Sequence, residues 1–495
     1  MRWWDDLWLN ESFAELMGLH TVEEATEYDG AWADFALARK AWGYRADSLP
    51  TTHPIAGAVP DNRAALMNFD GISYAKGAAA LRQLWAWIGE EVFFAGVRRY
   101  LDRHAWGNTS LADLLTALEE ESGRDLAAWS RSWLQTAGTS TIRVRDGHLV
   151  SDDDRPHLVG VGRYAGHPLR RVERFDVELP GATTHSPRRV EPADLVLPND
   201  GDLTFAKLRL DERSLVTVRT SLHTLDDPVA RALVWGSLWD AARDAELSPH
   251  DYVGIVLANV QGETDPDLVG TLLSQARVAA QLWAGSADLV ARLHEHEVSV
   301  VTEPGSDLQL AFHRAALATA PGRLPLPEGL PEDEELRWLQ LRRLAELGQV
   351  SSDELAATYS AEPTSTAQNH LAYATAALPD PAAKAGAWAE LTGAGELSTS
   401  RARALGQGFW RPGQDDLVAD YIDRYVVDVP QIWRRRSPEL AAVLTDSAFP
   451  ATVVAPSVVD RTAALTTADA DAGQRRVVLE CRDDLARAVA NRALF

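Results

Sequence analysis

The spacing of apolar residues changes twice along the chain, and this change limits the folds that it can adopt. Apolar residues follow a helical period from residue 1 to about 135, alternate with polar residues in short stretches from 138 to 222, and return to the helical period after Asp226. With 495 residues the chain can form two to four domains, each with its own core. We therefore predict a mainly α-helical protein with three domains, 1–137, 138–222 and 223–495, of which the middle one is a small β-sandwich.

The middle segment carries the signals of short antiparallel strands. Ile142 and Val144 alternate with polar residues, Asp146-Gly147 is a strong hairpin-turn pair, and Leu149 resumes the alternation. Frequent turns between short strands favour a sandwich of about 80 residues. Further strands are expected at Val159–Val161, Val172–Leu179, Asp194–Leu197, Leu203–Leu210 and Leu215–Arg219.

Start and stop signals place helices on both sides of this segment. In the first part, Ser110 and Asp113 form a capping pair, and Gly123 is a stop signal. About 270 residues of short helices that start alike follow the sandwich, and they predict stacked helical pairs that curve into a superhelix. The shared start is a capping residue followed by a proline suited to the first helical turn, at Asp227-Pro228, Asp265-Pro266, Asp380-Pro381 and Ser437-Pro438.

The charge balance and the cysteine usage narrow the possible functions and compartments. A net charge of −24 argues against a nucleic-acid partner, because phosphate binding needs clustered cations. Cys481 is the single cysteine, which rules out an internal disulfide and suits a reducing compartment. The sequence has no apolar run of membrane-span length, and its first residues lack the pattern of a secretory signal. We expect a cytoplasmic protein without a membrane or nucleic-acid partner.

The opening stretch holds the first candidate for chemistry. Tryptophans at positions 3, 4 and 8 lead into a helix-compatible run, in which Glu11 and Glu15 lie four residues apart on one helical face. A carboxylate beside so much aromatic surface needs a partner, which could be a metal ion, an arginine or solvent. For an isolated pair, an amphipathic helix whose glutamates face water is the more common interpretation.

A second candidate is the phrase Tyr74-Ala75-Lys76-Gly77-Ala78, which begins an alanine-rich helical pattern. By itself, a tyrosine in this position is more often a packing residue than a catalytic one. Gly77 would let its helix approach a neighbouring element closely.

Together the two phrases resemble the aminopeptidase N family of zinc metallopeptidases. In that family, His-Glu-x-x-His on one helix supplies two zinc ligands and the general base, and a glutamate within Trp-Leu-Asn-Glu-Ser-Phe-Ala-Glu on the next helix supplies the third ligand. The second phrase stands here as residues 8–15, so the resemblance implies that Glu11 is a metal ligand. Tyr74 lies 63 residues further on and matches the tyrosine of the family's Tyr-x-Lys-Gly-Ala phrase, whose hydroxyl donates to the oxyanion of the tetrahedral intermediate.

The resemblance extends over nearly the whole chain and implies its architecture. Asp47–Ile55 is similar to the family's Ser-Ser-His-Pro-Ile loop, in which we expect His53 to make a structural hydrogen bond, and Gly408–Gln414 is similar to a phrase of its C-terminal domain. The order of segments matches the last three domains of these enzymes: the helical part of a thermolysin-like catalytic domain, a β-sandwich and an α-helical superhelix. Peptides would be the substrates and would lose their N-terminal residues, but the residues that bind them cannot be named from this sequence.

Two motifs of the family have no counterpart here. The thirteen histidines include no His-Glu-x-x-His, and the Gly-x-Met-Glu-Asn segment that holds the substrate amino group is missing. In His294-Glu295-His296-Glu297 the histidines are two residues apart, which favours a solvated helix surface over a metal site. Since Glu11 is one of the three ligands that a catalytic zinc needs, we expect this chain alone to bind no zinc and to be inactive. We also expect the apolar surface of residues 7–18 to be exposed.

Three hypotheses follow from this half-site. The chain is a zinc aminopeptidase read from an internal methionine, a non-catalytic helical interaction module, or one part of a split enzyme whose N-terminal piece is a separate chain. Ten residues precede Glu11, whereas the family's spacer has eighteen, so the DNA upstream of Met1 distinguishes the three. A His-Glu-x-x-His ending eight residues before Met1 supports the first, which we favour; its absence leaves the second, and a separate upstream gene carrying it supports the third.

Overall fold

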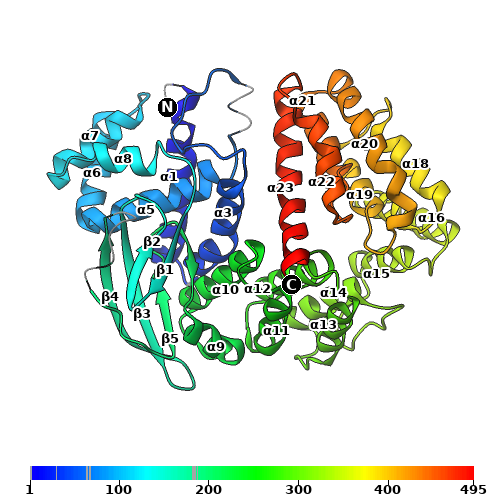
Figure 1. Ribbon diagram of the computed structural model, residues 1–495, viewed down its shortest axis with the longest axis horizontal. Helices are drawn as coiled ribbons and strands as arrows, with labels where there is room; N and C mark the ends of the chain where they lie inside the picture. The colour runs from blue at the N-terminus through cyan, green and yellow to red at the C-terminus, as the bar shows by residue number, and fades with distance from the viewer. Residues whose placement is uncertain (1–2, 29, 63–64, 66–67, 181–185, 187) are drawn as a thin grey trace. The chain divides into compact units, whose positions relative to one another are not determined.

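The computed structural model of the protein describes residues 3–28, 30–62, 65, 68–180, 186 and 188–495. The chain divides into two compact units, an N-terminal unit at residues 1–241 and a C-terminal unit at 242–495. Figure 1 shows helices and then strands in the first unit, and helices in the second. The three domain boundaries expected from the sequence stay predictions, because the helices and strands before residue 241 form one compact unit.

The N-terminal unit begins with helices and returns to helices after its strands, as the hydrophobic periods predict. Leu111 begins a helix behind a capping box, in which the Ser110 side chain and the Asp113 carboxylate each bond the other's backbone, and Gly123 ends that helix with φ +65°. The helices are α1 (Leu7–Ala25), α2 (Ala31–Asp34), α3 (Lys40–Ser48), α5 (Gly77–Ile88), α6 (Glu90–Arg103), α7 (Leu111–Ser122), α8 (Ala127–Trp133), α9 (Glu212–Ser221) and α10 (Pro228–Arg243), with the short turns η1 (Trp4–Asp6), η2 (Phe35–Arg39), η3 (Ile72–Lys76) and η4 (Leu222–Thr224).

The described strands form two three-stranded sheets, which correspond to the predicted sandwich. One sheet has the order β2-β1-β6 and the other β4-β3-β5; among these strands β1 and β6 run parallel, and the other neighbours run antiparallel. The hairpin between β1 and β2 turns at Asp146 and Gly147, both with positive φ (53° and 75°), which is the geometry that favours this residue pair. The strands are β1 (Ser140–Arg145), β2 (His148–Ser151), β3 (His157–Ala165), β4 (Arg170–Leu179), β5 (Leu195–Pro198) and β6 (Ala206–Arg209).

One predicted strand, Leu215–Arg219, is wrong. These residues lie in α9, whose first turn is capped by Asp211: its carboxylate accepts a hydrogen bond from the backbone of Ser214. The alternating Leu-Val-Thr-Val run suggested a strand, but the cap fixes the start of a helix, and that helix buries Ser214 and Val218 four residues apart on one face.

Buried polar contacts join the helices of the N-terminal unit to its sandwich. The ammonium group of Lys40, on α3, pairs with Asp202 at 2.5 Å and donates to the carbonyl of Thr204 at 2.7 Å. From the same helix, the Tyr44 hydroxyl donates to the carbonyl of Ala206 at the start of β6. These contacts hold α3, and the loop that follows it, against the sheet.

The C-terminal unit is a stack of helices, as predicted for residues after Asp226. Helices α15, α17, α19, α21 and α23 contact one another in succession, and α18, α20 and α22 form a second such row. None of the described helices is both long enough and apolar enough to cross a membrane. The helices are α11 (Pro249–Asn259), α12 (Pro266–Val278), α13 (Ala287–Ser299), α14 (Asp307–Thr319), α15 (Glu334–Glu346), α16 (Ser352–Ala361), α17 (Ser365–Ala377), α18 (Pro381–Thr392), α19 (Thr399–Phe409), α20 (Asp415–Arg435), α21 (Pro438–Ser447), α22 (Pro456–Thr462) and α23 (Ala472–Leu494), with the short turns η5 (Val260–Gly262), η6 (Ala279–Trp283) and η7 (Ala463–Thr466).

The segment Gly408–Gln414 has a structural role in this stack. A Cβ on Gly408 would lie 2.2 Å from the carbonyl oxygen of Tyr373, so only glycine lets α19 pack this closely on α17. Arg411 pairs with Glu346 at 2.9 Å, and the Gln414 amide donates to backbone carbonyls at the ends of α15 and α17. The segment therefore ties three helices together at one end.

Lys384 closes the same end from α18. Its buried ammonium group donates to the carbonyls of Ala376 and Phe409, both at 2.7 Å, and so caps the C-terminal ends of α17 and α19. Desolvation by burial and the nearby charge of Arg411 lower the pKa of Lys384 to about 7.

This shift predicts that the stability of the C-terminal unit rises with pH. Below pH 7 the lysine is charged in both states, whereas between pH 7 and about 10.4 the unfolded chain binds a proton that the folded chain does not. We expect the difference in thermal midpoint, wild type minus Lys384→Met, to increase as the pH rises from 6.5 to 9. A constant difference between the two midpoints would contradict this assignment.

Candidate functional site

Helix α1 carries both opening glutamates and is fixed by the apolar residues around them. Leu7, Trp8, Leu9 and Leu16 are all buried, and α1 lies against α5 and η3. The expectation that this apolar surface is exposed is therefore wrong for these four residues, three of which, Trp8, Leu9 and Leu16, belong to one buried core with residues of α5. Glu11, on the same helix, is half-buried.

Close contact between α1 and the Tyr74 segment depends on Ser12 and Gly77. The Ser12 hydroxyl donates to the carbonyl of Ser73 at 2.6 Å. A Cβ on Gly77 would lie 1.9 Å from the Ser12 oxygen, so the predicted close approach of this helix to a neighbour is confirmed, and the neighbour is α1.

Gly77→Ala should therefore destabilise the N-terminal unit by about 1–3 kcal/mol, because α1 must move away from η3. Gly18→Ala, on α1 itself, is the matched control. A Cβ at Gly18 would have nothing within 4 Å, and alanine there should raise the free energy of unfolding by up to about 1 kcal/mol through helix propensity. Thermal unfolding of both variants checks the pair. Equal midpoints would contradict the proposed close packing.

Asp70 and His53 fix the turn that carries Tyr74. One Asp70 oxygen accepts from the backbone nitrogens of Ile72 and Ser73, which caps η3, and the other contacts Nε2 of His53 at 3.0 Å. Nδ1 of His53 lies 2.8 Å from the carbonyl of Pro54. The structural hydrogen bond predicted for His53 is confirmed. The Asp70 cap was not predicted, although an aspartate just before a helical run is a recognisable start signal.

Tyr74 and Glu11, the two residues singled out from the sequence, lie together. The Glu11 carboxylate is close enough to the Tyr74 hydroxyl to act on its ionisation. Partial burial, the interaction with Glu11 and the charge of Glu15 raise the pKa of Tyr74 to about 12. The phenol is therefore protonated at neutral pH, so it has a proton to donate.

Arg39 completes the cluster as the partner of Glu15. Two parallel hydrogen bonds of 2.9 and 2.8 Å join the guanidinium to the carboxylate, and the bond to Glu15 raises the pKa of Arg39. The guanidinium lies 4.8 Å from the centre of the Trp42 ring, which in turn lies 5.8 Å from the Tyr74 ring. The sequence left a metal ion, an arginine or solvent as possible partners of the two glutamates. For Glu15 the partner is an arginine, Arg39.

Lys76 is buried behind this cluster and does not face it. Its ammonium group pairs with Asp47 at 2.9 Å and donates to the carbonyl of Gly138, in the segment that leads into β1. Asp47 also accepts hydrogen bonds from Thr139 and Thr52. Burial opposes ionisation of Asp47, but the charge of Lys76 and the hydrogen bonds from Lys76, Thr139 and Thr52 together outweigh it and lower the pKa of Asp47. The lysine of the phrase is therefore a structural residue that joins η3 to the start of the sandwich.

The donors around Glu11 meet part of what a catalytic zinc ion needs. Zinc requires three protein ligands, and among the described residues no three histidine, cysteine or acidic side chains converge on one point. Glu11 is suited to be one ligand, whereas Glu15 is held by Arg39. The described residues thus fit one third of a zinc site and do not by themselves fit the ion.

The helix surface predicted for His294-Glu295-His296-Glu297 is wrong in one respect. Glu295 is exposed, but Glu297 is buried and accepts a hydrogen bond from Thr319 of α14. A cavity between helices, rather than bulk solvent, surrounds the end of this segment. The spacing of the histidines could not predict that cavity, because most of the residues that line it come from α12 and α14.

Comparison with known proteins places the two units in one family. Residues 1–133 match the Peptidase family M1 domain, and residues 195–487 match the ERAP1-like C-terminal domain. The chain is 39% identical to Aminopeptidase N of Streptomyces lividans over 99% of its own length and 62% of that protein. It is also similar to Tricorn protease-interacting factor F2 of Thermoplasma volcanium (40% identity; 30% of this chain, 19% of that one) and to Aminopeptidase 2 of Candida albicans (38%; 52% and 27%). The chain thus spans less than two thirds of the length of each of these relatives.

Proposed function

The chain belongs to the M1 family of aminopeptidases, the aminopeptidase N family, and on this premise we propose that it forms part of a zinc-dependent enzyme that releases N-terminal residues from peptides. In this proposal Glu11 is a zinc ligand and Tyr74 donates a hydrogen bond to the oxyanion of the tetrahedral intermediate. The proximity of Tyr74 to Glu11 supports it most strongly, because the fold brings together two residues 63 positions apart that have neighbouring roles in the family.

The cluster supplies the chemistry that these two roles need. A neutral phenol can stabilise a developing negative charge without adding a second full charge to the site. Arg39 holds Glu15 through two hydrogen bonds, which leaves Glu11 as the carboxylate that faces the phenol. When bound, zinc would supply a Lewis acid and an activated water.

We further propose that this chain alone is inactive and that a segment bearing His-Glu-x-x-His completes the site. One ligand of three cannot hold zinc at useful affinity, and the general base of the family motif is not in this sequence. The partner in this proposal is therefore a polypeptide segment, fused or separate, in addition to the peptide substrate.

The test is to supply such a segment, fused ahead of Met1 or mixed as a separate chain, and to assay an aminoacyl-coumarin substrate. We expect turnover that requires zinc and that Glu11→Ala abolishes. Glu15→Gln is the matched control four residues along the same helix, and it should keep its bound zinc. Zinc binding that is unchanged by Glu11→Ala would contradict the assignment of the ligand.

A further inference from the structure

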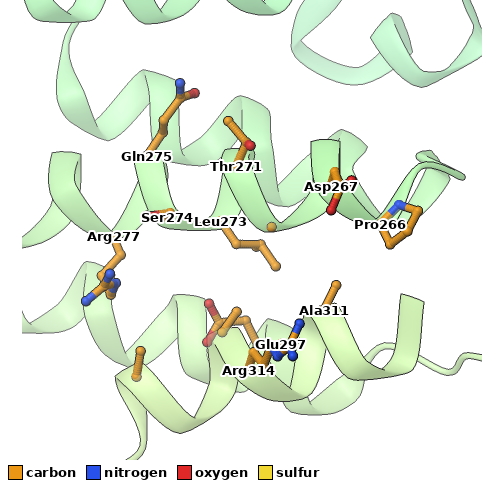
Figure 2. A pocket seen from close by; sticks show the side chains of 13 residues that line it. Pro266, Asp267, Thr271, Leu273, Ser274, Gln275, Arg277, Glu297, Ala311 and Arg314 are labelled. Atoms are coloured by element: carbon orange, nitrogen blue, oxygen red, sulfur yellow. The ribbon is translucent and has the colours of Figure 1, made fainter. Parts of the chain in front are cut away.

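A pocket of about 540 Å³ opens between α12 and α14 in the C-terminal unit, far along the chain from the Glu11 cluster. Figure 2 shows Arg277 and Leu273 reaching into it from α12, and Glu297 and Arg314 facing them from the other side. Leu273 and the alanines of α14 form its apolar wall. A pocket of this size, mostly apolar with a few convergent polar groups, is typical of small-molecule sites.

Arg277 places in this pocket a positive charge that has no ion-pair partner among the described residues. Within the part of the chain that the structure describes, its guanidinium makes no hydrogen bond and no ion pair. Burial, followed by the like charge of Arg411, lowers the pKa of Arg277. The nearby carboxylate of Glu346 is already paired with Arg411, so it does not serve as the partner of Arg277. A partly desolvated guanidinium with free donors is suited to bind a carboxylate through two parallel hydrogen bonds.

Glu297 brings an acceptor to the same space. Its side chain is 3% exposed, and one of its oxygens accepts from the Thr319 hydroxyl. Burial raises the pKa of Glu297 to about 7, even though Thr319 and the charge of Arg277 act in the opposite direction. Glu297 and Arg277 feel each other's charge but are not within the 4 Å of an ion pair, so a ligand with both charges would satisfy each of them.

We propose that this pocket binds a free α-amino acid with an apolar side chain. Its carboxylate pairs with Arg277, its ammonium group pairs with Glu297, and its side chain packs on Leu273 and the alanines of α14. A phosphate or a dicarboxylate would suit Arg277 but would repel Glu297. The inference stands apart from the proposed function, since it needs neither zinc nor turnover.

Titration calorimetry of the whole chain with L-leucine tests the site. We expect leucine to bind, and we expect N-acetyl-leucine, which lacks the ammonium group, and leucine amide, which lacks the carboxylate, to bind at least about tenfold more weakly. Arg277→Gln removes no hydrogen bond of the folded chain, so it should fold normally and weaken leucine binding by about tenfold or more. Arg337→Gln on α15, where the arginine pairs with Glu362 outside the pocket, is the control and should leave binding unchanged.

Three results would overturn the proposal: no leucine binding to the wild-type chain at millimolar concentration, equal binding of leucine and N-acetyl-leucine, or equal affinities of the wild type and a folded Arg277→Gln. The thermal midpoint of each variant establishes that it is folded. Failure here would leave the peptidase proposal untouched, because that proposal is tested by zinc-dependent turnover at Glu11.

Discussion

Lys76→Met should lower the free energy of unfolding of the N-terminal unit by about 3–5 kcal/mol, the usual cost of removing one partner from a buried ion pair. Lys76 and Asp47 both have fully buried side chains, and they lie 2.9 Å apart. The substitution leaves the Asp47 charge without its cation inside the protein, and it also removes the donor to the Gly138 carbonyl. Native-state hydrogen exchange of α5 amides reports on this unit without interference from the other.

Two further variants separate the ion pair from a general effect of losing a cation. Arg103→Met breaks an exposed pair with Glu120, which solvent screens, and should leave the free energy of unfolding almost unchanged. Adding Asp47→Asn to Lys76→Met should recover part of the loss, because no unpaired charge then remains buried. Similar losses for Lys76→Met and Arg103→Met would contradict the structural role given to Lys76.

Tyr74→Phe should lower the kcat of the enzyme completed with a His-Glu-x-x-His segment by about 10²–10³-fold, with little change in KM. The substitution removes one hydroxyl and keeps the ring that lies near Trp42. If the hydroxyl acts on the oxyanion, its loss affects the transition state and spares substrate binding. A stopped or coupled assay over a range of substrate concentrations separates the two constants.

Tyr28→Phe is the control for that experiment, because Tyr28 is 76% exposed and lies outside the cluster. Its kcat and KM should match those of the wild type. An unchanged kcat in Tyr74→Phe, or a loss confined to KM, would contradict the assignment of Tyr74 as the oxyanion donor.

Local chemistry made much of the fold predictable. The capping box at Ser110 and the Asp146-Gly147 turn are decided by neighbouring residues, and both are present in the structure as predicted. The strand predicted at Leu215–Arg219 failed because its alternating pattern also suits a short amphipathic helix, and the Asp211 cap decides in favour of the helix. Burial of Trp8 and Leu9 could not be predicted, since it depends on a core shared with α5, some seventy residues away.

The candidate site shows a similar division. Glu11 and Tyr74 could be singled out because their phrases match a family, whereas the pairing of Glu15 with Arg39 left no mark in the sequence. Nothing in the sequence distinguishes Arg39 from the other arginines; the fold brings it from η2 to Glu15 on α1. Arg277 and Glu297 were likewise hidden, because no sequence spacing relates α12 to α13 and α14.

The most direct test of the half-site is to measure bound zinc and turnover for this chain alone, at saturating zinc, beside the completed enzyme. The account predicts no stoichiometric zinc and no hydrolysis of an aminoacyl-coumarin by the chain alone, and both properties in the completed enzyme. Hydrolysis by the chain alone that is abolished by Glu11→Ala and by Tyr74→Phe would contradict it.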